Sequence, residues 1–282
     1  KFGVKQRASL AQKGEGVDSL SMSATPIPRT LALTLYGDMD VSTLEAFPAR
    51  KREVRTYLVP HKDPSIKKSL DKTLGEGGQV YVVAPQIEDR DDPGFNSVKK
   101  LYEGFQRFFP EETVLLHGKM KPEEKEEALS EFASGRKRIL VATSLIEVGI
   151  DVPKAHLLLV YEASHFSLSS LHQLRGRIGR DGVPSLCLLI EDDEEDAKGK
   201  LRVLVESEDG FEIAQADLGR RGFGELGGYK QSGLVDLRFA SLVDDYKVFV
   251  SAGKDAKWIL DHPSEESSAL IKMASTTVAV VD

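Results

Sequence analysis

The segment Gln173-Leu-Arg-Gly-Arg-Ile-Gly-Arg180 gathers the side chains of this chain that are best suited to phosphate chemistry. On a helix turning about 100° per residue, Gln173, Arg177 and Arg180 fall within about 60° of one another, whereas Arg175 points elsewhere. Gly176 and Gly179 each cost about 1 kcal/mol relative to alanine in a helix interior, but glycine permits close approach of the backbone to a bulky anion. Two fixed guanidinium groups stabilise charge on a transferring phosphoryl group, so we predict a catalytic face here. The alternative is a surface helix with scattered arginines.

A second segment, Ala142–Pro153, follows a predicted strand and offers hydroxyls and backbone amides to an anion. Thr143 and Ser144 lie where free amides at the end of a parallel strand form a cradle for a phosphate backbone. Gly149 permits a tight turn, and Asp151 could accept hydrogen bonds from a ribose hydroxyl. We expect nucleic-acid binding at the two hydroxyls and nucleotide binding at the glycine and the aspartate. The alternative is a strand–turn–strand connection in which the aspartate only forms the turn.

A third segment, Leu116-His-Gly-Lys-Met120, also follows a predicted strand. His117 and Lys119, with Lys121 nearby, could contact a nucleic-acid backbone through their positive charge and hydrogen bonds. The alternative is a structural histidine with ordinary hydrogen bonds.

Two weaker segments lie nearer the ends of the chain. In Ser23–Thr30 a double-proline turn would hold Thr25 and Arg29 in fixed positions. Near the other end, Arg220 and Arg221 could contact phosphates, although chemistry alone favours a helix whose last carbonyls they balance.

Some chemistry is missing from the printed sequence. It contains no Gly-x-x-x-x-Gly-Lys-[Ser/Thr] phosphate loop, no His-Glu-x-x-His pattern and no paired cysteines. The chain opens at Lys1 without a methionine, which leads us to expect an excised piece of a longer protein.

Composition sets broader bounds. A net charge of −7 argues against a general polyanion binder, so any nucleic acid must bind through local basic features. The acidic run 191–196 is typical of a solvated loop. Cys187 is the only cysteine and lies in an apolar run, which predicts a small buried side chain and a reducing cytoplasm. No apolar stretch is long enough to span a bilayer, and no secretion signal opens the chain.

From about Glu53 short apolar runs alternate with charged segments of helical period, which predicts a parallel sheet with helices on both faces. In such sheets function gathers in the loops that follow the strands. The strands are expected at Arg55–Val59, Gln79–Ala84, Thr113–Leu116, Arg138–Ala142, Leu157–Tyr161 and Ser185–Ile190, and the helices between them at Pro64–Leu74, Val98–Phe108, Pro122–Ala133 and Leu168–Ile178.

The sequence divides into three expected parts. Residues 1–46 carry too little apolar surface to fold alone. Residues 47–198 form the α/β domain. Residues 199–282 form a mainly helical region, with a helix capped by Asp209 and a long amphipathic pattern that ends near Leu260.

In this order and spacing, these segments resemble the RecG family of superfamily 2 DNA helicases. Ser23–Thr30 followed by Tyr36–Ser42 is similar to the family's motif III region, and Lys1–Arg7 to the segment after its Asp-Glu-x-His box. The segments at His117, at Thr143–Asp151 (motif V) and at Gln173–Arg180 (motif VI) follow in the family's order. Asp217–Gly233 resembles its translocation motif, with Arg221-Gly-Phe-Gly where the family commonly has Arg-Gly-Pro-Gly.

The resemblance implies two RecA-like domains that clamp ATP and Mg²⁺ between them. The first of these, with its phosphate loop and a wedge domain, would precede Lys1 and hold most of the nucleotide. From this chain the resemblance takes Arg177 and Arg180 as arginine fingers, Gln173 as a phosphate or water contact, Asp151 as a ribose contact and Thr143 as a DNA contact. Nucleotide state would be coupled to DNA grip and movement by Ser23, Thr25, Arg29, Arg220, Arg221 and Gln231.

The function implied is ATP-dependent remodelling of branched double-stranded DNA, at stalled forks and Holliday junctions, in cytoplasmic recombination and repair. The chain alone, without the phosphate loop, is expected to be inactive. Two alternatives stay open: a transcription-repair coupling translocase, which shares the Pro-Ile-Pro-Arg turn, and a non-catalytic RecA-like module that binds nucleic acid or protein.

Overall fold

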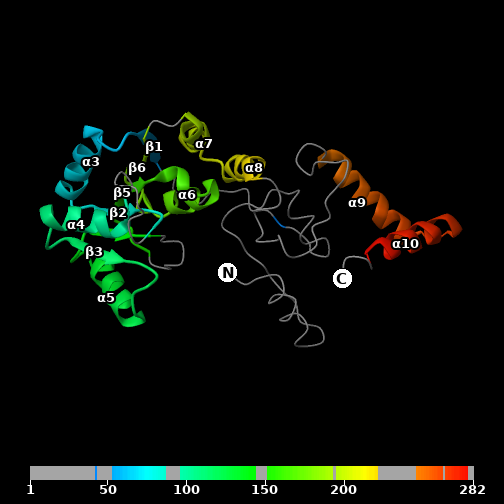
Figure 1. Ribbon diagram of the computed structural model, residues 1–282, viewed down its shortest axis with the longest axis horizontal. Coiled ribbons are helices and arrows are strands. Elements are labelled where there is room, and N and C mark those ends of the chain that lie inside the picture. The colour runs from blue at the N-terminus through cyan, green and yellow to red at the C-terminus, as the bar shows by residue number, and fades with distance from the viewer. Residues whose placement is uncertain are drawn as a thin grey trace.

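The computed structural model describes residue 42 and residues 53–86, 96–143, 151–192, 195–221, 246–262 and 264–278. Within these residues six strands form a single sheet in the order β1-β6-β5-β2-β4-β3, and every neighbouring pair is parallel (Figure 1). The strands are β1 (Val54–Val59), β2 (Gln79–Val83), β3 (Thr113–Leu116), β4 (Ile139–Ala142), β5 (Ala155–Tyr161) and β6 (Ser185–Ile190). This arrangement confirms the predicted α/β class.

Alternating side chains of the buried strands feed two separate cores, one on each face of the sheet. In β2, Val80 and Val82 pack with α3 (Pro64–Gly75) and α4 (Val98–Phe108). Tyr81 and Val83 project to the opposite face. All five residues of β2 are buried, as expected of a strand covered on both sides.

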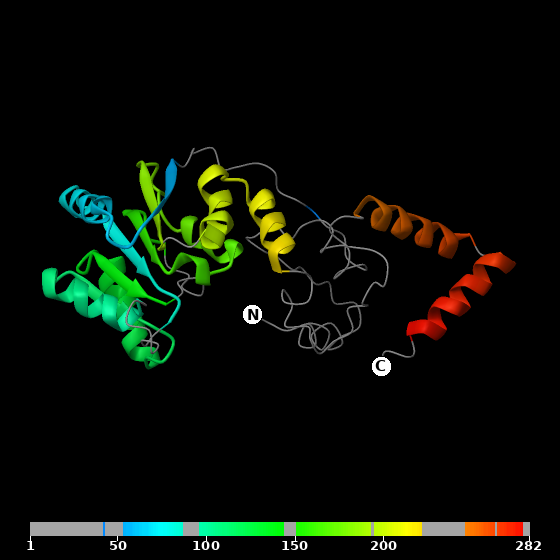
Figure 2. The ribbon, with the colours of Figure 1, turned by 45° about the horizontal axis from the view of Figure 1, so that its top comes forward.

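The second core is closed by α5 (Pro122–Ala133), α6 (Leu168–Arg175), α7 (Glu195–Glu206) and α8 (Gly210–Arg221). A 3-10 turn, η1 (Ala163–His165), leads from β5 into α6. In Figure 2, α7 and α8 are the two yellow helices beside the sheet.

Local signals in the sequence explain where several helices begin. The Asp63 carboxylate accepts a hydrogen bond from the Ser65 amide at 2.8 Å, and Pro64 occupies the first helical position of α3. In the same way the Ser97 hydroxyl caps α4, with Lys100 N at 3.2 Å. Pro122 opens α5, with Glu123 and Glu124 in its first turn.

The sequence predictions hold for most elements, with strand and helix ends shifted by at most two residues, but α6 and α7 differ. α6 ends at Arg175, not at Ile178. α7 begins inside the acidic run that we expected to be a loop and buries Leu201 and Leu204. The burial of Cys187 is confirmed, with 1% of it exposed.

Two further helices, α9 (Tyr246–Asp261) and α10 (Glu265–Val278), complete the described part of the chain. They carry large exposed apolar side chains, among them Trp258 on α9 and Met273 on α10. The Trp258 ring stacks on His262 with their centroids 4.7 Å apart. α9 matches the predicted amphipathic pattern, whereas α10 was not predicted.

Candidate functional site

The two predicted arginines lie in a tight turn that follows α6. Gly179 has a φ of +69°, and its amide donates a hydrogen bond to the Ala155 carbonyl at 3.0 Å. A Cβ added there would lie 3.1 Å from Ser185 Oγ and from Val54 Cγ2. Gly179 is therefore required by its left-handed backbone and by close packing against the first residues of β1 and β6.

This turn corrects the sequence interpretation that placed Gln173, Arg177 and Arg180 on one helical face. Gln173 lies in the last turn of α6, but the helix ends before both arginines. The Gly176 amide donates to the carbonyls of His172 and Leu174, which closes the helix, and Ile178 then enters the core fully buried. Gly179, which the sequence interpretation assigned to anion approach, shapes the turn that presents the arginines.

Asp151 meets this turn. Arg180 Nη1 lies 2.6 Å from Asp151 Oδ1, and the two side chains are 27% and 66% exposed. Burial raises the pKa of Tyr81 to about 12, while the charges of Arg177 and Arg180 oppose the shift and that of Asp151 adds to it. The three charges thus act on one buried phenol, and the Arg180–Asp151 pair lies closer to solvent.

A histidine–aspartate pair that the sequence did not reveal fixes the far side of the turn. His156 Nε2 lies 2.7 Å from Asp181 Oδ2, and Asp181 Oδ1 accepts the Val183 amide at 3.0 Å. Because His156 belongs to the first residues of β5, the pair ties the residue after Arg180 to the start of the sheet. We call the region formed by Asp151, Arg177, Arg180 and this turn the amino edge.

The other predicted residues lie where strands end. Leu116 of β3 pairs in register with Ala142 of β4, so the residues that follow them, His117 and Thr143, are neighbours at the opposite edge of the sheet. We call this region the carboxyl edge. In position, the expectation that site residues follow strands is therefore met by His117 and Thr143 but not by Asp151 and the arginines, which lie at the amino edge.

Positive charge gathers around His117. Burial lowers the pKa of His117, and the charges of Lys99, Lys119 and Lys125 lower it further. Its Nδ1 atom is buried and has no hydrogen-bond partner within the described residues, and its amide contacts Met120 Sδ at 3.3 Å. The uncharged imidazole thus lies among three lysines contributed by α4, α5 and the loop between β3 and α5.

Two buried charges, neither assigned a role from the sequence, join α6 to the helices that follow the sheet. Asp217 of α8 is 2% exposed and accepts hydrogen bonds from Leu168 N at 3.1 Å, Ser169 N at 3.3 Å and Ser169 Oγ at 2.8 Å. A carboxylate at a helix N-terminus is favourable both as a cap and with respect to the helix dipole.

At the other end of α6, Arg175 is 6% exposed and donates to the carbonyls of Leu204 and Ser207 at 2.8 and 3.0 Å. The guanidinium group thereby caps the C-terminal end of α7. Burial lowers the pKa of His172 to about 4, so this histidine is neutral and can accept the third Arg175 hydrogen bond, at 3.0 Å. The prediction that Arg175 points away from the other two arginines is confirmed.

The remaining predicted site residues are only partly described. Arg220 and Arg221 form the last turn of α8, and their side chains lie outside the described residues. The same holds for the whole of Ser23, Thr25, Arg29, Ser144, Gly149 and Gln231.

Part of the acidic run 191–196 has defined partners, which corrects its reading as a solvated loop. Glu191 Oε2 accepts the Ser164 amide at 2.7 Å. Asp192 Oδ1 lies 2.8 Å from His61 Nδ1, while His61 Nε2 lies 3.0 Å from Glu162 Oε1. Hydrogen bonding to Glu162, only partly offset by burial, raises the pKa of His61 to about 9.

This cluster predicts a pH-dependent stability that replacing His61 by glutamine removes. His61 has a folded pKa of about 9 against an ordinary value of 6.5, so its contribution is full below pH 6.5 and is lost as the pH rises through 9. Urea unfolding at pH 6.5 and pH 9.5 should give a stability difference between wild type and His61→Gln that shrinks at the higher pH. A difference that stays constant or grows would contradict this assignment.

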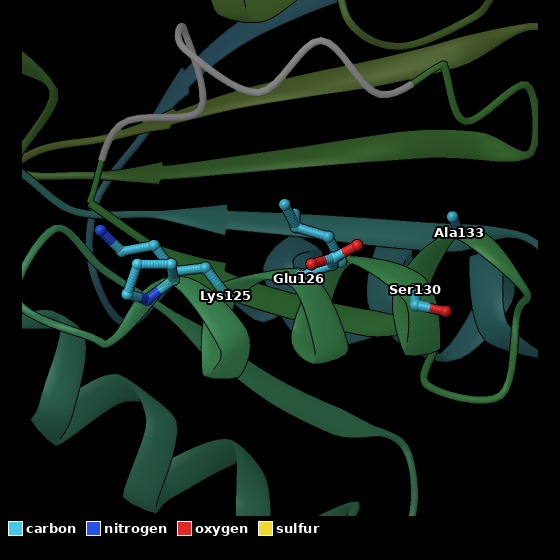
Figure 3. A pocket seen from close by; sticks show the side chains of 6 residues that line it. Lys125, Glu126, Ser130 and Ala133 are labelled. Carbon is cyan, nitrogen blue, oxygen red and sulfur yellow. The ribbon is translucent and has the colours of Figure 1, made fainter.

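A hollow lies along α5, and Lys125, one of the lysines near His117, is among the residues that line it. It has a volume of about 550 Å³ and is lined by Pro122, Lys125, Glu126, Leu129, Ser130 and Ala133. Figure 3 shows that the labelled side chains come from a single helix. The accessible surface of this hollow is mostly that of the aliphatic parts of these side chains.

The described residues contain no group of three or more His, Cys, Asp or Glu side chains that could hold a metal ion. Their helices are too short or too polar to cross a membrane.

Comparison with protein families places the sheet in a known class. The model of the helicase conserved C-terminal domain matches residues 64–182, from the start of α3 to the turn after the arginines. A second model, described as ATP-dependent DNA helicase RecG, domain 3, C-terminal, matches residues 207–274. The fold and the site thus define the C-terminal domain of a RecA-like helicase.

Individual relatives narrow this class. The chain is 40% identical over 260 residues to ATP-dependent DNA helicase RecG of Bacillus subtilis, covering 91% of this chain and 38% of the relative. Against the same helicase of Thermotoga maritima it is 43% identical over 263 residues, which is 92% of this chain and 34% of the relative. The structure of RecG bound to a three-way DNA junction superimposes with a TM-score of 0.67 and 41% identity, over 84% of this chain and 31% of that one.

The chain belongs to the RecG family, of which it carries the helicase C-terminal domain and domain 3. It spans between a third and two fifths of the length of the curated relatives it matches. The match to RecG domain 3 favours this family over the transcription-repair coupling translocases.

Proposed function

We propose that this chain is the second half of the motor of an ATP-dependent DNA helicase that remodels branched DNA in recombination and repair. The observation that carries the proposal is the separation of two kinds of chemistry at opposite edges of one sheet. An acid and two arginines lie at the amino edge, and a lysine-rich surface around His117 lies at the carboxyl edge. A motor domain needs both, because it must respond to a nucleotide on one side and hold a phosphate backbone on the other.

At the amino edge the proposal assigns ATP to Asp151, Gln173, Arg177 and Arg180. The donors fit a polyphosphate, because guanidinium groups bind phosphoryl oxygens in a fixed, forked geometry. The exposed Asp151 carboxylate fits a ribose hydroxyl. Arg180 and Asp151 already lie 2.6 Å apart, so an acceptor for the sugar and a donor for the phosphates are held side by side. A preceding helicase domain would supply the phosphate loop and most of the Mg²⁺ coordination.

At the carboxyl edge the proposal assigns the DNA backbone to Thr143, Ser144, His117 and Lys119. The lysines that surround His117 supply the sequence-independent attraction on which phosphate-backbone contacts depend. A chain with a net charge of −7 can bind DNA in this way because the basic groups are local.

The buried Asp217 gives the arginine turn a physical connection, through α6, to α8. α6 runs from its Asp217 cap at one end towards the arginine turn at the other, so displacement of that turn acts on α8. Arg220 and Arg221 lie in the last turn of α8, and Gln231 follows in the sequence. We propose that these residues, with Ser23, Thr25 and Arg29 of the preceding segment, convert nucleotide-driven closure into movement along duplex DNA.

This assignment also proposes a division of the chain. Residues 1–46 would complete the first helicase domain, 47–198 would form the second RecA-like domain, and 199–282 would form the helical region with the translocation motif. The partners would be branched double-stranded DNA and the wedge and first helicase domain of the same protein.

The proposal is tested by comparing the 282-residue chain with the full-length protein on forked DNA. The full-length protein should hydrolyse ATP in a DNA-stimulated manner and unwind the fork. The chain alone should show no DNA-stimulated hydrolysis, because the printed sequence lacks a phosphate loop. Hydrolysis by the chain alone, or a full-length protein that hydrolyses ATP without any response to DNA, would contradict the proposal.

A further inference from the structure

Glu162, directly after β5, has a backbone conformation that such a residue rarely adopts. Its φ of 52° and ψ of 47° make it the one non-glycine residue with positive φ in the described part of the chain. A left-handed backbone in a non-glycine residue is strained and persists only where the surroundings enforce it. The side chain is also buried, at 6% exposed. Both features indicate that its carboxylate is held in place by specific partners.

The partners of the Glu162 carboxylate come from two distant loops. Asn96 donates to Oε1 through its amide at 3.0 Å and through its side-chain nitrogen at 2.9 Å. His61 Nε2 lies 3.0 Å from the same oxygen, and His61 is held in turn by Asp192. Burial alone would raise the pKa of Glu162, but the hydrogen bonds from His61 and Asn96 outweigh it and lower the pKa. The group is therefore an anion at neutral pH.

Asn96 lies just before α4, which carries one of the lysines of the carboxyl edge. Asn96 is followed by the buried cap Ser97 and the fully buried Val98, which leave the start of α4 little freedom. Lys99 then stands in the first turn of α4, where its charge reaches His117. Fixing Asn96 therefore fixes where Lys99 lies relative to the lysines contributed by α5 and its preceding loop.

We propose that Glu162 is a positioning residue for the DNA-facing edge: its buried carboxylate anchors the N-terminus of α4 through Asn96 and so sets Lys99 beside His117 to meet a backbone phosphate. The inference rests on the proposed function of the carboxyl edge and adds α4 to it. Glu162 itself does not touch the nucleic acid. Its role is to hold one cationic group in register with its neighbours.

A double-mutant cycle in the full-length protein tests this coupling. The variants are Glu162→Ala, Lys99→Ala and the two together, and the measurement is the Kd for forked DNA over a series of salt concentrations. Lys99→Ala should raise Kd about three- to tenfold and reduce the slope of log K against log salt by about one. Glu162→Ala should do nearly the same, and the double variant should be little weaker than either single one.

Conservative and control variants separate positioning from general destabilisation. Glu162→Gln keeps an oxygen acceptor for Asn96 and should recover most of the affinity and the salt slope. His61→Gln removes the contact of the imidazole with Glu162 and should lower the stability without changing the salt slope. If Glu162→Ala does not fold, Asn96→Ala removes one anchoring bond and should give a smaller loss that is again non-additive with Lys99→Ala.

The outcomes distinguish this inference from the function on which it rests. Additive losses in the double variant, or an unchanged Kd in folded Glu162→Ala, would overturn the positioning role while leaving the DNA edge in place. Unchanged DNA binding in both Lys99→Ala and Lys119→Ala would instead overturn the assignment of DNA to this edge.

Discussion

Replacing Arg180 by alanine in the full-length protein is expected to lower the DNA-stimulated kcat for ATP hydrolysis about a thousandfold. The reason is that a guanidinium group aimed at a transferring phosphoryl group stabilises charge that develops only in the transition state. The side chain comes from a turn whose backbone is held by Gly179 and by the His156–Asp181 pair. Arg180→Lys should recover little, because an ammonium group lacks the forked donor geometry.

The loss in Arg180→Ala should not come from unfolding. The Arg180–Asp151 pair is open to solvent, and exposed ion pairs contribute about 0–1 kcal/mol. Thermal unfolding should therefore differ little from wild type. Arg202→Ala is the matched control, because this arginine is exposed and pairs with Glu206 of the same helix at 2.8 Å. Wild-type ATP hydrolysis by the Arg180→Ala protein would contradict the assignment of Arg180 as an arginine finger.

Replacing Asp217 by alanine is expected to cause the largest loss of stability among the polar substitutions considered for this chain. The change removes a buried carboxylate and leaves the Leu168 amide, the Ser169 amide and the Ser169 hydroxyl without their acceptor. Hydrogen bonds to a charged group and loss of a helix cap suggest a decrease of about 2–3 kcal/mol in the free energy of unfolding. Urea denaturation of the 282-residue chain at neutral pH measures it.

Asp71→Ala is the control for Asp217→Ala. Asp71 also lies on a helix, but it is exposed, and its replacement should change the stability by less than about 0.5 kcal/mol. If the two variants were equally stable, α8 would not be joined to α6 by its carboxylate. The physical connection proposed between the arginine turn and the C-terminal region would then be absent.

The sheet could be predicted from the sequence because its signals are local. Each strand is a short apolar run, and helices such as α4 and α5 carry a cap or a proline at the position where they begin. Burial on both faces then follows from the alternation of strands and helices along the chain. The spatial order of the strands and the register of β3 with β4, which makes His117 and Thr143 neighbours, come from the structure and are not predicted by this alternation.

The arginine turn could not be predicted in the same way, because tertiary packing decides it. Helical periodicity continues to Ile178, but Gly179 takes a positive φ in order to pack against Val54 and Ser185, which belong to other strands. The assignment of Arg177 and Arg180 to phosphate chemistry does not depend on the helix and stays a prediction, whereas the helical geometry predicted for them is wrong.

The buried charged groups were missed for a related reason. Glu162 meets His61 across 101 residues of sequence and Asn96 across 66, and no local pattern announces such partners. The acidic run 191–196 was misread because its composition is typical of a loop, whereas Glu191 and Asp192 bind specific groups and the run continues into α7. A charged residue can therefore be predicted from the sequence to be exposed only when no residue far away in the sequence pairs with it.

The proposed separation places the nucleotide and the DNA at opposite edges of one sheet. Its most direct test is the Kd for forked DNA, measured at one salt concentration for Arg180→Ala and Lys119→Ala of the full-length protein. Lys119→Ala should raise the Kd about three- to tenfold, whereas the Kd of Arg180→Ala should stay within about twofold of the wild-type value. An equal loss of DNA affinity in the two variants would contradict the separation of the edges.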